Sequence, residues 1–193
     1  KNGKLWKEII PIAFHVDYWN HLGWKDKFAN NNFSKRQRKY NSIGHSRSVY
    51  TPGFFVNGKE WSSWFRRSSR QISLTTKKTG KLTVILKNNI LDVEFTPVNL
   101  SPKPMSVHLA YLGMNIKNKI NSGENDGKIL KHSFVVLEHQ SRPTRVNQGK
   151  IREKLPFRLK KYKGHTPGAL VVWLSYQNDP TPLQAVGGWL NKE

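Results

Sequence analysis

Two histidines and an aspartate lie close together near the start of the chain, at His15, Asp17 and His21. Residues two apart on a strand point to the same face, so the carboxylate could orient the imidazole of His15, or both could approach a metal ion with His21 nearby. The alternative is structural: these side chains, together with Trp19 and Trp24, fix the backbone of an irregular loop by hydrogen bonds. We favour the structural interpretation and predict no metal site, because no acidic cluster flanks these residues.

The second candidate is a group of cations that fall within little more than one helical turn: Lys35, Arg36, Arg38 and Lys39. No acidic residue occurs between positions 27 and 59 to offset them. If they converge on the outer face of a helix, they form a patch for an anionic ligand. The alternative is an ordinary solvated helix face in a very basic protein.

The whole chain is strongly basic. Its 193 residues include 33 Lys and Arg against 12 Asp and Glu, a formal net charge of +21 with a pI near 10.3. Such a surface attracts polyanions or anionic membranes in a salt-dependent way. The absence of cysteine excludes disulfides, thiolate metal sites and a cysteine nucleophile, and no apolar run reaches the roughly 18 residues of a bilayer span. No motif indicates a cofactor or dedicated nucleic-acid recognition.

Several local patterns indicate the elements that position these residues. Apolar alternation from Ile10 to Tyr18 predicts a central strand with both faces covered. Ser34 to Gln37 has the spacing of a capping box, which predicts a helix that begins there and ends near Gly44. Asn57-Gly58 favours positive φ at both residues and predicts a tight hairpin turn. Residues 64 to 72 indicate a weak helix at most.

The second half of the chain has a different sequence pattern. Strand-like runs separated by turn-rich stretches cover residues 82–86, 90–95, 106–112, 129–137, 168–176 and 183–190. This pattern predicts a mostly antiparallel, sandwich-like β portion at residues 77–193, packed on a first portion at residues 1–76.

The chain resembles a bacterial secreted thioredoxin-like family, catalogued as domain of unknown function 1223. The segments that carry the resemblance in the first half are His15 to Trp19, Leu22 to Asp26, Phe28-Ala29, Phe33-Ser34, Arg36 to Arg38, Ser48 to Pro52 and Val56 to Gly58. In the second half they are Gly123 to Asn125, Gly127, Leu130, His132 and Val135-Val136. The resemblance implies an α/β fold: a thioredoxin-like unit, incomplete at its N-terminus, followed by the β-rich portion.

The resemblance has further implications. Family members usually begin with a strand and a loop that carries two cysteines. We favour such a segment ahead of Lys1; the alternative is a family member that never had it. In thioredoxin-like folds a cis proline faces the cysteines, so we expect a cis Thr51-Pro52 bond, with Tyr50, Thr51 and Pro52 as a loop that faces a protein or peptide substrate. An exported, periplasmic or secreted, location is also implied.

Two functions are compatible with the sequence. In the first, the intact protein handles thiols or disulfides, while the present cysteine-free chain is redox-silent. In the second, the chain is a non-enzymatic binding module whose basic surface holds an anionic ligand or partner.

Overall fold

The computed structural model describes residues 3–22, 25–65, 72, 78–101, 103–120, 126–158 and 166–190. These residues form one α-helix, one short 3-10 helix and eleven strands. The elements of the first half are α1 (Asn31–Ser42), β1 (Phe55–Val56), β2 (Lys59–Glu60) and η1 (Ser62–Phe65). Those of the second half are β3 (Gly80–Lys87), β4 (Ile90–Pro97), β5 (Met105–Met114), β6 (Ile116–Lys119), β7 (Ile129–His132), β8 (Val135–Thr144), β9 (Ile151–Pro156), β10 (Thr166–Tyr176) and β11 (Asp179–Trp189).

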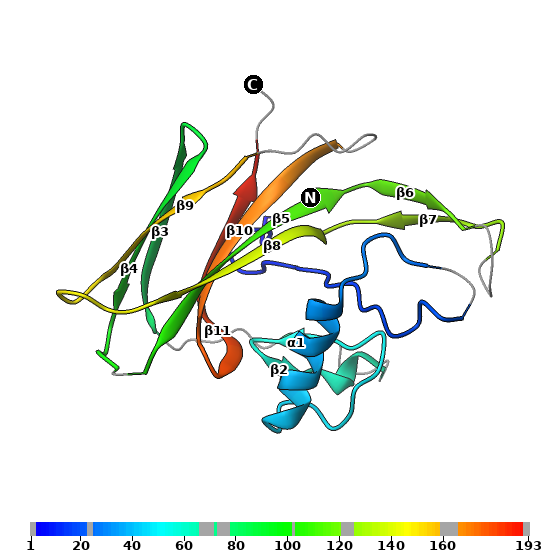
Figure 1. Cartoon of the computed structure of the whole chain (residues 1–193), viewed down its shortest axis with the longest axis horizontal. Helices are drawn as coiled ribbons and strands as arrows, with labels where there is room; N and C mark the ends of the chain where they lie inside the picture. Colours follow the sequence, from blue (N-terminus) through cyan, green and yellow to red (C-terminus); the bar gives the residue numbers. More distant parts are fainter. Residues whose placement is uncertain are drawn as a thin grey trace.

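Two antiparallel sheets face each other in the second half (Figure 1). One has four strands in the order β11-β10-β5-β8, and the other has three in the order β3-β4-β9. The core between them is apolar and includes Phe95, Val107, Leu109 and Leu174, each at most 3% exposed. Two sheets packed face to face over an apolar core make this half a β-sandwich. Burial of these side chains supplies the main favourable contribution to its folding free energy.

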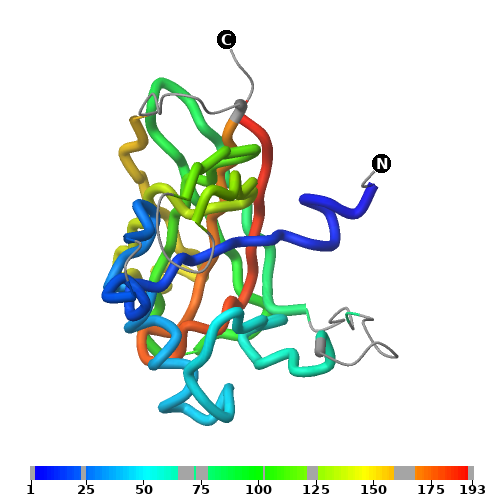
Figure 2. The backbone as a smooth tube through the Cα atoms, turned by 90° about the vertical axis from the view of Figure 1, so that its right-hand side faces the viewer, coloured from blue at the N-terminus to red at the C-terminus, as the bar shows by residue number. Residues whose placement is uncertain are grey.

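The opposite face of the four-stranded sheet is also buried. All ten residues of β5 are buried, because residues such as Val107 face the sandwich core while Ala110 and Leu112 face a second core. The second core is closed by Phe33 of α1 and by the N-terminal segment around Phe14. Figure 2 shows this segment, in blue, crossing the strands rather than running beside them.

A long hairpin extends the four-stranded sheet to one end of the molecule. After β5 the chain passes Asn115 (φ 51°) into β6, and β7 returns through Phe134 (φ 61°) into β8. These two left-handed residues separate the outer pair β6-β7 from the main sheet, so the pair forms a distinct two-stranded extension (Figure 1).

The predicted α/β, thioredoxin-like fold is wrong: the chain is mostly β, with antiparallel sheets and one α-helix of 12 residues among those described. Ile10 to Val16 is not a central strand, because only Ala13 forms a β-bridge, to Val135. Its alternating apolar residues instead lie over a face of the sheet. Alternation shows which side chains are buried and does not show whether the backbone pairs.

Other expectations have mixed outcomes. The helix begins at Asn31, capped by the Asn30 side chain, and not at Ser34, although Gly44 does take the predicted left-handed φ of 76°. The turn at Asn57-Gly58 is confirmed, with positive φ at both residues. A Cβ on Gly58 would lie 2.4 Å from Thr181, so close packing also requires glycine there.

The antiparallel β character of residues 82–190 is confirmed, although β6 and β9 were not predicted. Most of residues 64–77 lie outside the described residues, so the domain boundary between residues 76 and 77 stays a prediction.

Candidate functional site around helix α1

Helix α1 presents two chemically different faces. Phe33, Arg36 and Tyr40 follow one another at spacings of three and four residues, so they share the side that faces the sheet. Lys35, Arg38 and Lys39 share the other side and are exposed. The four predicted patch residues therefore divide, three outward and one inward.

The inward residue, Arg36, is held by hydrogen bonds and aromatic rings. Its Nη2 donates to the Tyr40 hydroxyl at 2.9 Å and to the Pro180 carbonyl at 3.0 Å. The Tyr40 hydroxyl donates to the same carbonyl at 2.8 Å. The guanidinium carbon lies 5.0 Å from the ring centre of Phe14 and 5.6 Å from that of Trp173, which is cation-π distance. Arg36 thereby joins α1 to the N-terminal segment, to β10 and to the start of β11.

The placement of Arg36 corrects the predicted patch. Burial lowers the pKa of the guanidinium, and no described carboxylate forms an ion pair with it. Aromatic faces and a carbonyl oxygen take the place of a counter-ion. Arg36 is thus a structural cation, and the exposed patch consists of Lys35, Arg38 and Lys39; we call these three residues the α1 cation face.

Three parallel rings lie beneath Arg36. Those of His108, His139 and Trp173 have centroids 4.9 to 5.6 Å apart and interplanar angles of at most 9°. Burial lowers the pKa of His108 to about 3 and that of His139 to about 4, and the charge of Arg36 adds to both shifts. Ser175 donates its hydroxyl proton to the Tyr176 carbonyl, so its oxygen accepts from Nε2 of His108. Both imidazoles are neutral at pH 7, which suits a site beside a cation.

The carboxylate that orients His15 is Asp26 and not Asp17. Nδ1 of His15 lies 2.6 Å from Oδ2 of Asp26, whose other oxygen accepts from the Phe28 amide at 2.9 Å. Burial would raise the pKa of Asp26, but the hydrogen bonds from His15 and Phe28 outweigh it and leave the pKa below its ordinary value. Asn20 accepts from the Asp26 amide at 3.0 Å. These contacts fix the loop backbone, in agreement with the structural interpretation.

The other predicted polar-site residues do not join His15. Asp17 accepts from the Ser34 hydroxyl, a hydrogen bond that lowers its pKa, and its amide donates back to Ser34. Trp19 and His21 are exposed, and their rings stack with centroids 6.4 Å apart. Trp24 lies outside the described residues.

The predicted substrate-facing loop is tied to α1 and to β2. The Thr51-Pro52 bond is cis, as predicted, and both side chains are exposed. The Tyr50 carbonyl accepts from the Gln37 amide, and the Tyr50 hydroxyl donates to Glu60 at 2.6 Å. Burial, with Glu60 as a second cause, raises the pKa of Tyr50 to about 12.

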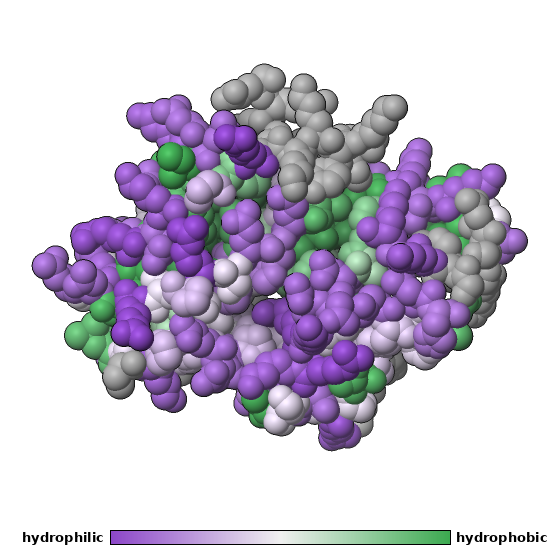
Figure 3. Space-filling view, viewed as in Figure 1, coloured by the Kyte–Doolittle hydropathy of each residue, from purple (hydrophilic) through white to green (hydrophobic). Residues whose placement is uncertain are grey.

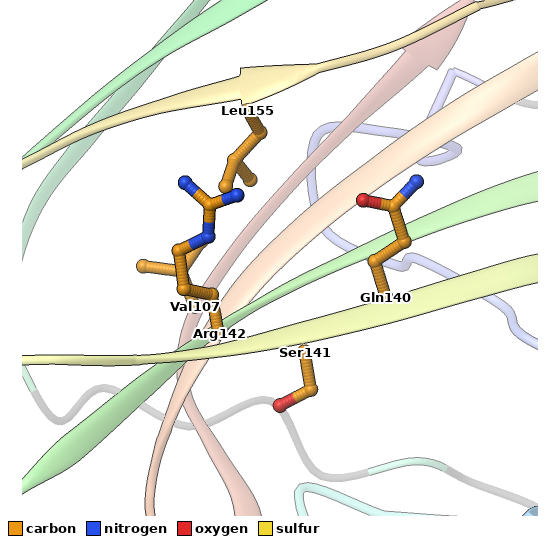
Figure 4. A pocket seen from close by; sticks show the side chains of 5 residues that line it. All are labelled: Val107, Gln140, Ser141, Arg142 and Leu155. Carbon is orange, nitrogen blue, oxygen red and sulfur yellow. The ribbon is translucent and has the colours of Figure 1, made fainter.

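A hollow of about 350 Å³ lies on the flank of the sandwich, where β8 and β9 form the edges of the two sheets (Figure 4). Val107 and Leu155 give it an apolar floor, and Gln140 and Arg142 project over it, while Ser141 points away. Nη1 of Arg142 donates to the Lys154 carbonyl at 3.2 Å, which links β8 to β9. The hollow carries no arrangement of groups for catalysis.

A protein family described as a protein of unknown function, DUF1223, matches residues 2–175. The chain belongs to this family. No curated protein matches the chain. Among solved structures, the DUF1223 chain is similar to a protein from Agrobacterium tumefaciens, with a TM-score of 0.60 and 18% identity over 91% of this chain and 78% of that one. It is also similar to HBP35 of Porphyromonas gingivalis, with a TM-score of 0.52 and 15% identity over 82% of this chain and 58% of that one. At these identities the likeness concerns the fold alone.

The carboxylates of the DUF1223 chain are largely used within the fold. Hydroxyl, imidazole or amide groups, rather than Lys or Arg, donate to Asp17, Asp26, Glu60, Glu153 and Asp179. Within the described part, ion pairs take up the cations Lys4, Lys150, Arg152 and Lys154. Most of the other cations in the described part form no ion pair there. Hydrophilic side chains cover most of the face shown in Figure 3.

Two negative findings concern the described residues alone. They contain no group of three or more His, Asp or Glu placed to hold a metal ion. They also contain no helix with the length and hydropathy of a bilayer span.

Sequence reasoning missed the inward turn of Arg36 and the role of Asp26. The inward position of Arg36 could have been predicted from the sequence, because Arg36 falls between Phe33 and Tyr40 on the buried helix face. The role of Asp26 could not, because an irregular loop brings Asp26 back to His15.

Proposed function

We propose that this DUF1223 chain is a non-enzymatic binding module that holds an anionic ligand, bearing phosphate, sulfate or carboxylate groups, on the α1 cation face. The main observation in support is that Lys35, Arg38 and Lys39 share one exposed side of a short helix and form no ion pair with a described carboxylate. Cations so placed add their fields, which raises both the association rate and the affinity for a polyanion.

Two features support this proposal over a solvated helix face. Arg36 anchors the helix to the sheet from the opposite side, so the three cations are held on a fixed backbone. Arg38 also lies 6.0 Å from the Tyr18 ring, a contact that limits the directions its guanidinium takes. A preorganised cation loses less entropy on binding than a free one.

The proposed location is the periplasm or the exterior of a bacterial cell. Thiol exchange is not part of the proposal, because residues 1–193 include no cysteine to supply a thiolate. The exposed Thr51-Pro52 loop remains a candidate contact for a peptide partner.

The test compares two variants with the same loss of charge. Lys35→Gln, Arg38→Gln and Lys39→Gln remove the α1 cation face together. Lys7→Gln, Lys81→Gln and Lys87→Gln remove three exposed lysines elsewhere. We expect the first variant to elute from heparin at clearly lower salt than the second, because adjacent cations act on one anion. Equal elution of the two variants would show that only net charge matters and would overturn the proposal.

A further inference from the structure

The outer pair β6-β7 carries a second group of cations with an unusual register. Lys117 lies directly opposite Lys131, and Lys119 lies opposite Ile129. Residues directly opposite each other point to the same face, as do residues two apart along a strand. Lys117, Lys119, Ile129 and Lys131 therefore share one face, and all four are exposed. We call them the hairpin face.

The other side of the same hairpin is occupied. Ile116 is 2% exposed, and the ring of His132 lies 5.4 Å from that of His15 and 5.9 Å from that of Phe28. The hairpin thus rests on the loop that follows residue 14 and turns its lysines outward. This arrangement fixes which side is free to meet a partner.

Among the described residues, no carboxylate pairs with the lysines of the hairpin face, Lys117, Lys119 and Lys131. Like charges directly opposite on a two-stranded ladder repel, and this repulsion lowers the stability of the free hairpin. Binding of an anionic surface to the hairpin face would reduce this repulsion.

An exposed apolar side chain lies among these lysines. Ile129 is 63% exposed within the hairpin face. Lysines that flank apolar side chains suit a lipid surface, where the ammonium groups meet phosphates while the apolar groups enter the acyl boundary.

We propose that the hairpin face is a docking surface for an anionic lipid bilayer. Charge complementarity and the exposed Ile129 favour lipid over nucleic acid, because the face offers no aromatic or arginine side chain to stack on bases. The inference rests on the proposed function. It adds a second binding surface and names the class of ligand.

The test measures cosedimentation with vesicles of phosphatidylcholine, with and without phosphatidylglycerol. Three variants are compared: Lys117→Gln with Lys119→Gln and Lys131→Gln; Ile129→Ser; and the triple α1 variant described above, which has the same charge change as the first. Each lysine near an anionic bilayer contributes about fivefold in affinity, so the hairpin triple variant should bind about a hundredfold more weakly. Ile129→Ser should weaken binding about fivefold, with a loss that persists at high salt.

The outcomes separate the two proposals. Loss of vesicle binding in the hairpin triple variant, with heparin elution affected mainly by the α1 variant, supports both. Equal vesicle binding by the two triple variants, or no binding of the unchanged chain, overturns the lipid inference and leaves the heparin result to decide the proposed function. Unchanged binding by Ile129→Ser also overturns it, because a contact that is purely electrostatic would accept any polyanion, nucleic acid included. Circular dichroism confirms that each variant keeps its strand content.

Discussion

At the scale of single residues, Arg36 is a cation with a structural role. The other cations of α1, the α1 cation face, are exposed to solvent. Arg36 instead contacts Phe14, Trp173 and the Pro180 carbonyl. A lysine keeps the charge but lacks the planar fork that donates to two acceptors and stacks on rings. The role of Arg36 therefore depends on the shape of its guanidinium as well as on its charge.

We predict that Arg36→Lys lowers the free energy of unfolding by about 1–2 kcal/mol, through lost hydrogen bonds and weakened cation-π contacts. Arg38→Lys is the matched control, because the same substitution at an exposed position should change stability by less than about 0.5 kcal/mol. Urea denaturation measures both. Equal losses in the two variants would show that Arg36 does not anchor the helix.

At the scale of elements, the N-terminal segment acts as a cover for a sheet face. Phe14 makes edge-to-face contacts with Phe33 at 5.1 Å and with Trp173 at 6.4 Å, so it connects the segment to α1 and to β10. The backbone is held by the bridge at Ala13 and by the His15 carbonyl, which accepts from the Asn30 amide at 3.1 Å. Side-chain packing of Phe14 adds to these backbone contacts.

Phe14→Ala should destabilise the fold by about 2–3 kcal/mol, since it removes a large side chain from the second core. Leu100→Ala, at a side chain that is 72% exposed, should cost less than about 0.5 kcal/mol. Thermal unfolding followed by circular dichroism compares them. A similar small change for both variants would mean that the segment is not packed on the sheet.

The same elements explain how far the sequence could be interpreted. The strands of the second half were predictable because their runs are apolar, regular and bounded by turn residues; β6 and β9 are short and carry charges at exposed positions, so their pattern is weak. The alternation from Ile10 to Val16 was correct as a statement of burial and wrong as a statement of strand pairing. The His15-Asp26 pair depends on a loop without periodicity, so no local rule predicts it.

At the scale of the whole molecule, the surplus of positive charge follows from the composition, 33 Lys and Arg against 12 Asp and Glu, and several of these carboxylates accept hydrogen bonds from neutral groups of the fold. Glu60 and Glu153 accept from the hydroxyls of Tyr50 and Thr144, and Asp26 binds His15. Cations that pair with no described carboxylate lie on two separate surfaces, the α1 cation face and the hairpin face. Each surface adds to a long-range attraction for anions that the net charge of +21 already provides.

The contact between the α1 cation face and an anionic ligand is tested most directly by the salt dependence of binding to a heparin oligosaccharide. The logarithm of the affinity falls linearly with the logarithm of the salt concentration, with a slope that grows by close to one for each contacting cation. We predict that Lys35→Gln with Arg38→Gln and Lys39→Gln reduces this slope by about two to three, while Lys7→Gln with Lys81→Gln and Lys87→Gln leaves it nearly unchanged. The same slope in both variants would contradict a localised binding surface on α1.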